Sequence, residues 1–245
     1  MIRYFLQLSY KGTRYFGWQR QPNAISVQEV VEKTLSTVLR EDIAVVGAGR
    51  TDAGVHATYY VLHFDVLNEI SEPEKLVYHL NRFLPYDIAI QKIRKVDNDF
   101  HARFSAFSRT YKYFISTEKN PFQTDTNFQY TGFLDVEKMN EAARILFYYH
   151  DFTSFSKLHT DVKTNNCKIY EAAWKRENGQ LVFTIKADRF LRNMVRAIVG
   201  TLLEVGKGKI TVDDFRKIVE KKNRGVAGTS VPPQGLFLVD IGYNA

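Results

Sequence analysis

The stretch from residue 47 to residue 57, GAGRTDAGVHA, holds the residues best suited to chemistry. A carboxylate, Asp52, follows Arg50 by two positions, among small residues that let the backbone approach a ligand closely. Such a loop can cradle a phosphate, form a tight turn, or present Asp52 to a substrate.

Spacing excludes the phosphate-binding motifs. A dinucleotide fingerprint that starts at Gly47 requires glycine where Asp52 stands. A P-loop that starts at Gly49 requires Lys-Ser/Thr where the sequence has Val55 and His56. The loop alone therefore favours a turn in which the Asp52 side chain caps a helix or bonds nearby backbone, because aspartates in loops form such bonds more often than they act in catalysis.

The histidines do not have the spacing of metal ligands, and the single cysteine, Cys167, excludes a cysteine-based zinc cluster and an internal disulfide. His56 is close enough to Asp52 in sequence to suggest a general base, but a histidine satisfied by backbone partners is favoured. The six histidines are His56, His63, His79, His101, His150 and His159.

Aromatic and basic side chains alternate in ARFSAFSRTYKYF, residues 102–114. On a strand, Arg109, Tyr111 and Tyr113 share one face and Lys112 lies on the other. A tyrosine beside a cation can stack on a nucleobase, although tyrosines half-buried in a sheet are more common.

A second basic group lies in ADRFLRNMVRAIVG, residues 187–200. If this segment is helical throughout, Arg189, Arg192 and Arg196 lie on one face. The alternative is an amphipathic helix whose basic face is simply solvated.

Composition is consistent with a polyanionic partner. The 245 residues carry a net charge of +7, and 14% of them are aromatic, with 18 Phe and 14 Tyr. The apolar run at the N-terminus is too short for a signal peptide, and no segment approaches membrane-spanning length, so we expect a cytoplasmic protein.

Each part of the chain mixes strands and helices. Capping-box spacing at Ser26 and Glu29 predicts the start of one helix, and Ser71 with Glu74 the start of another. Asn178-Gly179 predicts a hairpin turn, and we place a domain boundary near residue 105. Thr211 with Asp214 predicts the start of a further helix. Strands are expected at residues 2–10, 43–49, 59–66, 88–96, 108–117 and 235–243, a hairpin at 167–187, and helices at 26–39, 71–83, 134–149, 189–206 and from Thr211 onward.

Several segments in order resemble the tRNA pseudouridine synthases of the TruA type. The loop GAGRTDAGVHA resembles that family's catalytic loop, and the resemblance covers nearly the whole chain. Tyr60 stands where the family usually has glutamine, which predicts the loss of a local polar contact. The other matching segments are SYKGTRYFGWQRQ, SVQEVVEKTL, FHARFSAFSRTYKY, DFTSF, FLRNMVRAIVGTLLEVG and AGTSVPPQGLFLV.

The resemblance implies an α+β fold of two similar α/β halves, residues 1–105 and 106–245. These form a continuous mixed, mainly antiparallel sheet flanked by helices, with a central active-site cleft. It also implies a homodimer that binds the anticodon arm of tRNA and isomerises uridine to pseudouridine at positions 38–40, without metal or cofactor. The alternative is a catalytically silent RNA-binding protein that uses the same basic and aromatic surface.

The resemblance also implies roles for individual residues. Asp52 becomes the catalytic carboxylate, which attacks C1′ or C6 or assists a glycal route. Arg196 partners that carboxylate, and such a cation would offset the effect of burial on its charge. Tyr111 stacks on the uracil, and Arg50 helps to displace the base. Further substrate contacts are expected from Leu236, Arg189 and Arg192.

Overall fold

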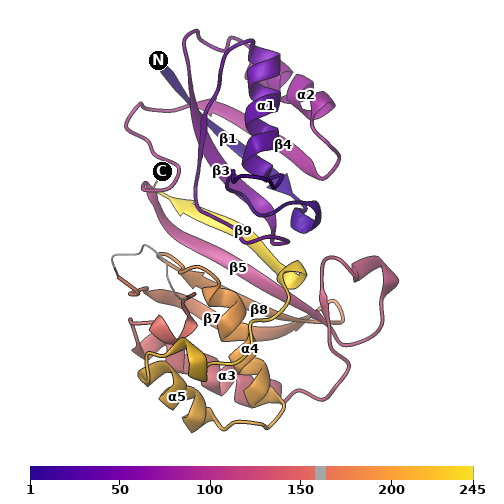
Figure 1. Ribbon diagram of the computed structural model, residues 1–245, viewed down its shortest axis with the longest axis vertical. Coiled ribbons are helices and arrows are strands. Elements are labelled where there is room, and N and C mark those ends of the chain that lie inside the picture. The colour runs from indigo at the N-terminus through magenta and orange to yellow at the C-terminus, as the bar shows by residue number, and fades with distance from the viewer. Residues whose placement is uncertain (158–163, 245) are drawn as a thin grey trace. The chain divides into compact units, whose positions relative to one another are not determined.

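The computed structural model describes residues 1–157 and 164–244, so His159, one of the six histidines that lack the spacing of metal ligands, lies outside the described residues. Over the described part, five α-helices accompany nine strands in a mixed, mainly antiparallel sheet, which confirms the predicted α+β class (Figure 1). None of the described helices is long and apolar enough to cross a membrane.

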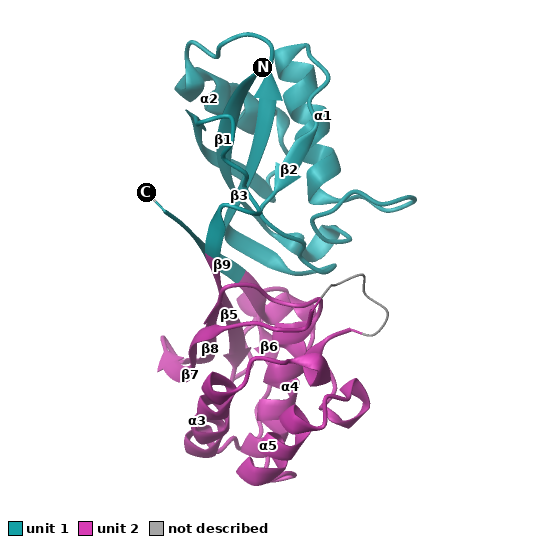
Figure 2. Cartoon of the chain, turned by 90° about the vertical axis from the view of Figure 1, so that its left-hand side faces the viewer, with its two compact units in different colours: residues 1–107, 238–245 teal, residues 108–237 magenta. Residues whose placement is uncertain are grey.

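The chain divides into two compact units (Figure 2). Unit 1 contains Met1–Phe107 and Leu238–Ala245, and unit 2 contains Ser108–Phe237. The halves 1–105 and 106–245 and the cleft between them stay predictions.

Unit 1 is built on a strand, β1, that pairs antiparallel with β3 on one side and β4 on the other. The short strand β2 pairs antiparallel with β3, so the loop between β2 and β3 starts and ends on adjacent strands. The elements are β1 (Ile2–Tyr10), α1 (Val27–Leu39), β2 (Val45–Gly47), β3 (His56–Val66), α2 (Pro73–Phe83) and β4 (Ile88–Lys95).

The helices α1 and α2 contact each other and cover the strands of unit 1 (Figure 1). The Ser26 side chain accepts a hydrogen bond from the Glu29 amide at 3.2 Å, so the predicted cap of α1 is confirmed. The prediction that Ser71 caps the second helix is wrong. The cap residue is Glu72, because Pro73 provides the first helical position without needing a donor.

Apolar residues of α1 close the core of unit 1. Val27, Val31 and Leu35 recur at helical spacing and are completely buried, as are Leu6 and Leu8 of β1. Burial of each such side chain contributes about 2 kcal/mol relative to an exposed one. The core therefore holds α1 against the strands from which the Asp52 loop emerges.

Unit 2 contains an antiparallel β5–β8–β7 arrangement, with β6 parallel to β5. The helices α3, α4 and α5 contact one another, and α3 lies against β7. The remaining elements of the chain are β5 (Ala106–Ser116), β6 (Phe128–Gln129), α3 (Val136–Ile145), β7 (Ile169–Glu177), β8 (Gln180–Ala187), α4 (Met194–Gly206), α5 (Val212–Glu220) and β9 (Leu236–Tyr243).

Turn and cap chemistry predicted two features of unit 2 correctly. Asn178 and Gly179 join β7 to β8 with φ angles of 49° and 76°, the positive values that a type I′ hairpin turn requires. Thr211 and Asp214 form a complete capping box at the start of α5, each side chain accepting the other residue's amide.

The predicted helix over residues 189–206 is wrong in its first turn. The helix α4 begins at Met194, because Asn193 has a left-handed backbone with φ 65°. Before it, the Asp188 carboxylate accepts the amides of Lys168 and Arg189 at 2.8 and 2.7 Å, which holds the segment outside the helix. Arg189 and Arg192 therefore precede the helix, and the predicted helical face with Arg196 does not form.

His63 of β3 is a buried histidine in unit 1. Its Nδ1 accepts a hydrogen bond from the Ala102 amide at 3.0 Å, and its ring meets that of His101 with centroids 4.8 Å apart. Burial, which is the largest cause, and the charges of Arg3 and His101 together lower the pKa of His63 to about 4, and the charge of Asp65 opposes them. His63 is therefore neutral in the folded protein at neutral pH.

This depressed pKa predicts a loss of stability in mild acid. Between about pH 6.5 and about pH 4 the unfolded chain binds a proton that folded His63 does not. The free energy of unfolding should therefore fall as pH falls through this range, by up to about 1.4 kcal/mol per pH unit from this residue. His63→Asn, whose amide oxygen can still accept from Ala102, should reduce the slope. Urea unfolding from pH 7 to pH 4.5 measures it, and an unchanged slope in the variant would contradict the assignment.

Candidate active site

The loop between β2 and β3, residues 48–55, presents Arg50 and Asp52 from unit 1. The Arg50 side chain is exposed, whereas Asp52 is partly buried. The Val55 amide bonds the Asp52 carbonyl at 3.1 Å, which makes a tight turn directly after the carboxylate residue. Asp52 thus lies in a turn through its main-chain carbonyl, and the residue is partly exposed.

Neighbouring backbone, rather than regular secondary structure, fixes this loop. The Trp18 amide donates to the Thr51 carbonyl at 3.3 Å, and the Gly54 amide donates to the Tyr15 carbonyl at 3.2 Å. Gly17 has a φ of 88°, and a Cβ atom there would clash with the Thr51 carbonyl. The segment after β1 therefore approaches the Asp52 loop too closely for any residue but glycine at this point.

Two tyrosine hydroxyls also hold the loop. The Tyr10 hydroxyl lies 2.8 Å from the Thr51 Oγ1, one residue before Asp52. The Tyr60 hydroxyl donates to the Gly49 carbonyl. The predicted loss of a polar contact at Tyr60 is therefore wrong, because the phenol reaches the loop backbone itself.

His56 follows the loop at the start of β3 and is completely buried. Its Nδ1 accepts a hydrogen bond from the Gly12 amide at 2.9 Å. The interpretation of His56 as a histidine satisfied by backbone is therefore confirmed, and this nitrogen is engaged by the protein rather than available as a base.

In unit 2, Tyr111 lies on β5 and is partly buried. The Phe190 ring meets it edge-on, with centroids 5.2 Å apart and planes at 90°. The edge contact fixes the orientation of the Tyr111 ring. Arg109, two residues earlier on β5, donates from Nη1 to the Asp188 carbonyl at 3.0 Å. Both side chains thus contact the segment that precedes α4.

Tyr113 differs from Tyr111 because it belongs to the core. Its ring is completely buried, and its hydroxyl donates to the Pro232 carbonyl at 2.9 Å. Burial raises the pKa of Tyr113 well above its ordinary value, and the positive charge of Arg196 offsets part of this effect. Tyr113 therefore remains neutral and serves to fix the segment that contains Pro232.

Arg196 lies in the first turn of α4 and is partly buried. Its Nε donates to the Val231 carbonyl at 2.8 Å, and the Val231 amide donates back to the Arg196 carbonyl at 3.2 Å. This reciprocal pair fixes the guanidinium relative to the chain before β9.

The other predicted substrate contacts also belong to unit 2. Arg192 is exposed and Arg189 partly buried, both ahead of α4. Leu236, at the start of β9, is 5% exposed. The pairing of Asp52 with Arg196 and Tyr111 joins residues of different units and stays a prediction.

Sequence reasoning missed the residues that support the Asp52 loop. Tyr10 and Trp18 lie far before the loop in the sequence and Tyr60 lies after it, and no spacing rule links them to Gly49 or Thr51. The available signal was the density of aromatic residues just after the first strand and in the strand after the loop.

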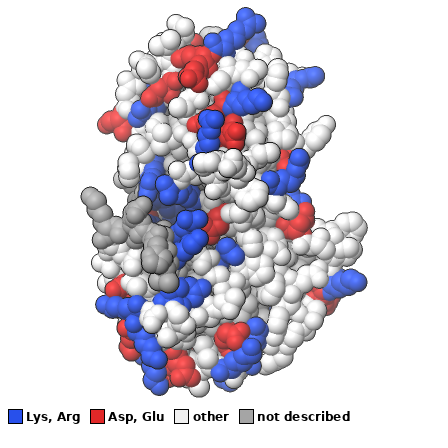
Figure 3. Space-filling view, in the orientation of Figure 1, with Lys and Arg blue, Asp and Glu red and all other residues white. Residues whose placement is uncertain are grey.

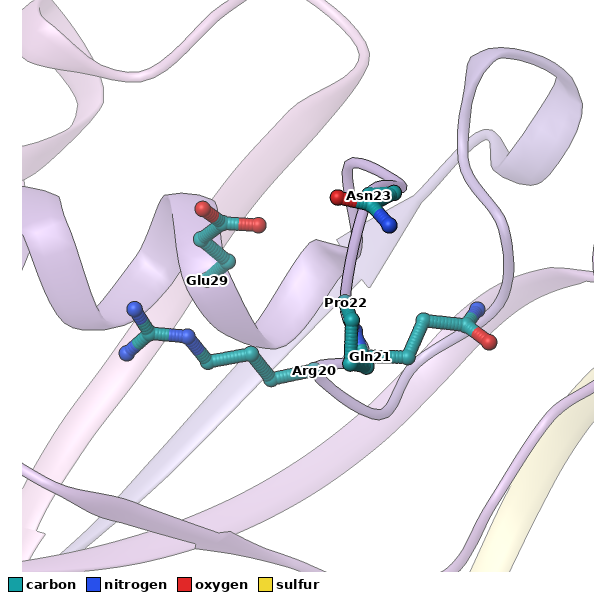
Figure 4. A pocket seen from close by; sticks show the side chains of 5 residues that line it. All are labelled: Arg20, Gln21, Pro22, Asn23 and Glu29. Carbon is teal, nitrogen blue, oxygen red and sulfur yellow. The ribbon is translucent and has the colours of Figure 1, made fainter.

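Unit 1 also has an open hollow of about 420 Å³ at the start of α1 (Figure 4). Polar side chains dominate its wall, which is unlike the apolar lining of a typical small-molecule pocket. None of the predicted site residues is among those that line it, which are Arg20, Gln21, Pro22, Asn23 and Glu29.

Basic side chains are numerous on the face shown in Figure 3, with acidic ones among them. The sequence has 34 lysines and arginines against 27 aspartates and glutamates. Such an excess favours association with a polyanion.

Comparison with known proteins identifies a family for this chain. A model of the tRNA pseudouridine synthases matches residues 8–105 and 142–244. A protein of Bacteroides fragilis named tRNA pseudouridine synthase A is 60% identical over 98% of this chain and 96% of its own. A protein of the same name from Bacteroides thetaiotaomicron is 58% identical over 99% of this chain and 91% of its own length. One from Clostridium acetobutylicum is 43% identical over 97% of this chain and 98% of its own length. The chain therefore belongs to the tRNA pseudouridine synthases, a family of isomerases.

Proposed function

We propose that this chain isomerises uridine to pseudouridine in the anticodon arm of tRNA, at positions 38–40, with Asp52 as the reacting carboxylate. Family membership supports isomerisation of uridine in tRNA. The observation that carries the role of Asp52 is the fixed loop, which combines a partly exposed aspartate with an exposed arginine two residues earlier.

The reaction suits a site of this kind. The N1–C1′ bond of uridine breaks, the uracil turns, C5 bonds to C1′, and the C5 proton leaves as N1 gains one. Atoms and electrons balance without a redox partner or water. One nucleophilic or charge-stabilising carboxylate and firm positioning of the detached base are sufficient.

The target base must leave the helical stack, at a cost on the order of a few kcal/mol. Arg50 is exposed on the loop and is suited to hold the displaced RNA backbone. Tyr111, its ring oriented by Phe190, supplies a flat surface for the uracil. Arg196 supplies the positive charge that stabilises the carboxylate, and Leu236 an apolar contact to the base.

Binding of tRNA is proposed to use the positive surface, including Arg189 and Arg192. By resemblance we also propose a homodimer and a cytoplasmic location. The net charge of +7 supports a polyanionic substrate, because phosphate contacts release counterions.

Asp52→Asn should abolish pseudouridine formation while tRNA binding persists. The change removes the carboxylate but keeps the shape of the side chain, and it makes the protein more positive by one charge. Release of tritium from C5-labelled uridine in tRNA measures turnover, and filter binding measures affinity.

Asp97→Asn is a matched control, because Asp97 is an exposed aspartate of unit 1 outside the loop. It makes the same change in charge and should keep wild-type turnover. Turnover in Asp52→Asn would contradict the role of the carboxylate. Stoichiometric tRNA binding by the wild type without tritium release would instead favour the silent RNA-binding protein.

Arg196→Lys should lower the single-turnover rate by roughly tenfold or more, because lysine keeps the charge but has no Nε to donate to Val231. Arg224→Lys is the control, since Arg224 also bonds this segment, at the Ala227 and Gly228 carbonyls. An equal loss in both variants would show that the segment, and not the site, is affected.

Arg192→Ala should weaken tRNA binding and reduce the slope of log affinity against log salt by about 1 if its guanidinium meets a phosphate. Arg144→Ala removes the same charge from an exposed position on α3 and should leave the slope unchanged. Affinities measured between 50 and 200 mM salt, a range of about fourfold, give both slopes. Identical slopes in wild type and Arg192→Ala would exclude the contact.

A further inference from the structure

Tyr60 is completely buried in β3, directly beneath the start of the Asp52 loop. Its ring stacks on Trp18, with centroids 4.1 Å apart, and meets the edge of Tyr10 at 5.6 Å. These contacts leave the ring little freedom, so its hydroxyl is held at one point. That point is the Gly49 carbonyl, three residues before Asp52.

The same aromatic group holds the residue next to Asp52. The Tyr10 hydroxyl bonds the Thr51 side chain at 2.8 Å, and the Trp18 amide bonds the Thr51 carbonyl at 3.3 Å. The Tyr10 and Trp18 rings are also in contact, with centroids 6.2 Å apart. Three rings that pack on one another therefore fix the loop at Gly49 and at Thr51, on the approach to the carboxylate.

We propose that Tyr60 is a positioning residue for catalysis, which sets the place of the Asp52 carboxylate through its hydrogen bond to Gly49. The inference rests on the proposed role of Asp52. A fixed carboxylate matters because a reacting group displaced by about 1 Å can lose on the order of a hundredfold in rate. Tyr60 does not touch the substrate, so its effect belongs to the chemical step and not to the binding of tRNA.

The competing interpretation is that Tyr60 only fills the core. The two interpretations differ in the atom that matters, because a core-filling role needs the ring and a positioning role needs the hydroxyl. Tyr4 provides the comparison within unit 1. It is also buried, its ring stacks on Phe64, and its hydroxyl accepts the Ile70 amide at 2.9 Å, away from the loop.

The test compares Tyr60→Phe with Tyr4→Phe. Each variant loses one buried hydroxyl and keeps the ring, so both should fold and lose similar stability in thermal unfolding. Tyr60→Phe should lower the single-turnover rate of tritium release about tenfold or more. Its affinity for tRNA should stay within about twofold of wild type, a small difference on the affinity scale. Tyr4→Phe should retain the wild-type rate.

Hydrogen exchange gives a readout that is independent of activity. Peptides that cover residues 47–57 should exchange amide hydrogens faster in Tyr60→Phe than in the wild type. In Tyr4→Phe their exchange rate should equal that of the wild type. Tyr60→Gln, which replaces the phenol by a smaller donor, should recover part of the rate if the hydrogen bond is the cause.

The outcomes separate this inference from the proposed function. Turnover in Asp52→Asn would remove the basis of both. An inactive Asp52→Asn together with a wild-type rate in Tyr60→Phe would overturn the positioning role alone. Equal loss of rate in Tyr60→Phe and Tyr4→Phe, or a loss of tRNA affinity in place of rate, would also overturn it.

Discussion

The proposed site of unit 1 depends on the hydrogen bonds that satisfy the backbone of residues 48–55. This loop carries the proposed catalytic carboxylate and lies outside any helix or strand, so its polar groups need partners from elsewhere. Residues 10–18 supply backbone hydrogen bonds to Thr51 and Gly54 and the hydroxyl of Tyr10, and Tyr60 of β3 supplies a further hydroxyl to the Gly49 carbonyl. Two loops that are separate in sequence are thus one structural element.

Unit 2 uses a comparable arrangement for its proposed catalytic arginine. Arg196 and Val231 exchange hydrogen bonds through one side-chain nitrogen, one amide and two carbonyls. Tyr113 bonds the neighbouring Pro232 carbonyl from the core. In both units, the charged groups expected to act on RNA are fixed by backbone contacts with a second loop, so each charge is oriented before substrate arrives.

Local rules predicted the elements that local interactions determine. The cap at Ser26, the hairpin turn at Asn178-Gly179 and the capping box at Thr211 depend on neighbours within a few residues, and the sequence displays those neighbours. The first turn expected before α4 failed because the carboxylate of Asp188 and the left-handed backbone of Asn193 compete with helix formation. The helical spacing of apolar residues does not reveal such competing hydrogen bonds and backbone conformations.

The roles of the site residues stay predictions, whereas the loop that carries two of them is described by the structure. Asp52 and Arg50 share one loop, and the resemblance to a family assigned them roles that the loop alone did not. The supports of the loop could not be predicted, because Tyr60 and Gly49 meet only when β2 and β3 pair. A tyrosine in place of glutamine indicated a lost contact, whereas the fold gives the longer side chain a new one.

The bond from Tyr60 has a consequence for how this sequence can vary. It reaches a main-chain oxygen, so the support it gives does not depend on which side chain residue 49 carries. A Cβ atom at Gly49 would have no neighbour within 4 Å, whereas one at Gly47 would collide with Tyr60 and Trp18. Mutational drift can therefore alter the outer surface of the loop while its inner side stays constrained, and the RNA contacts proposed near Arg50 can diversify without moving the carboxylate.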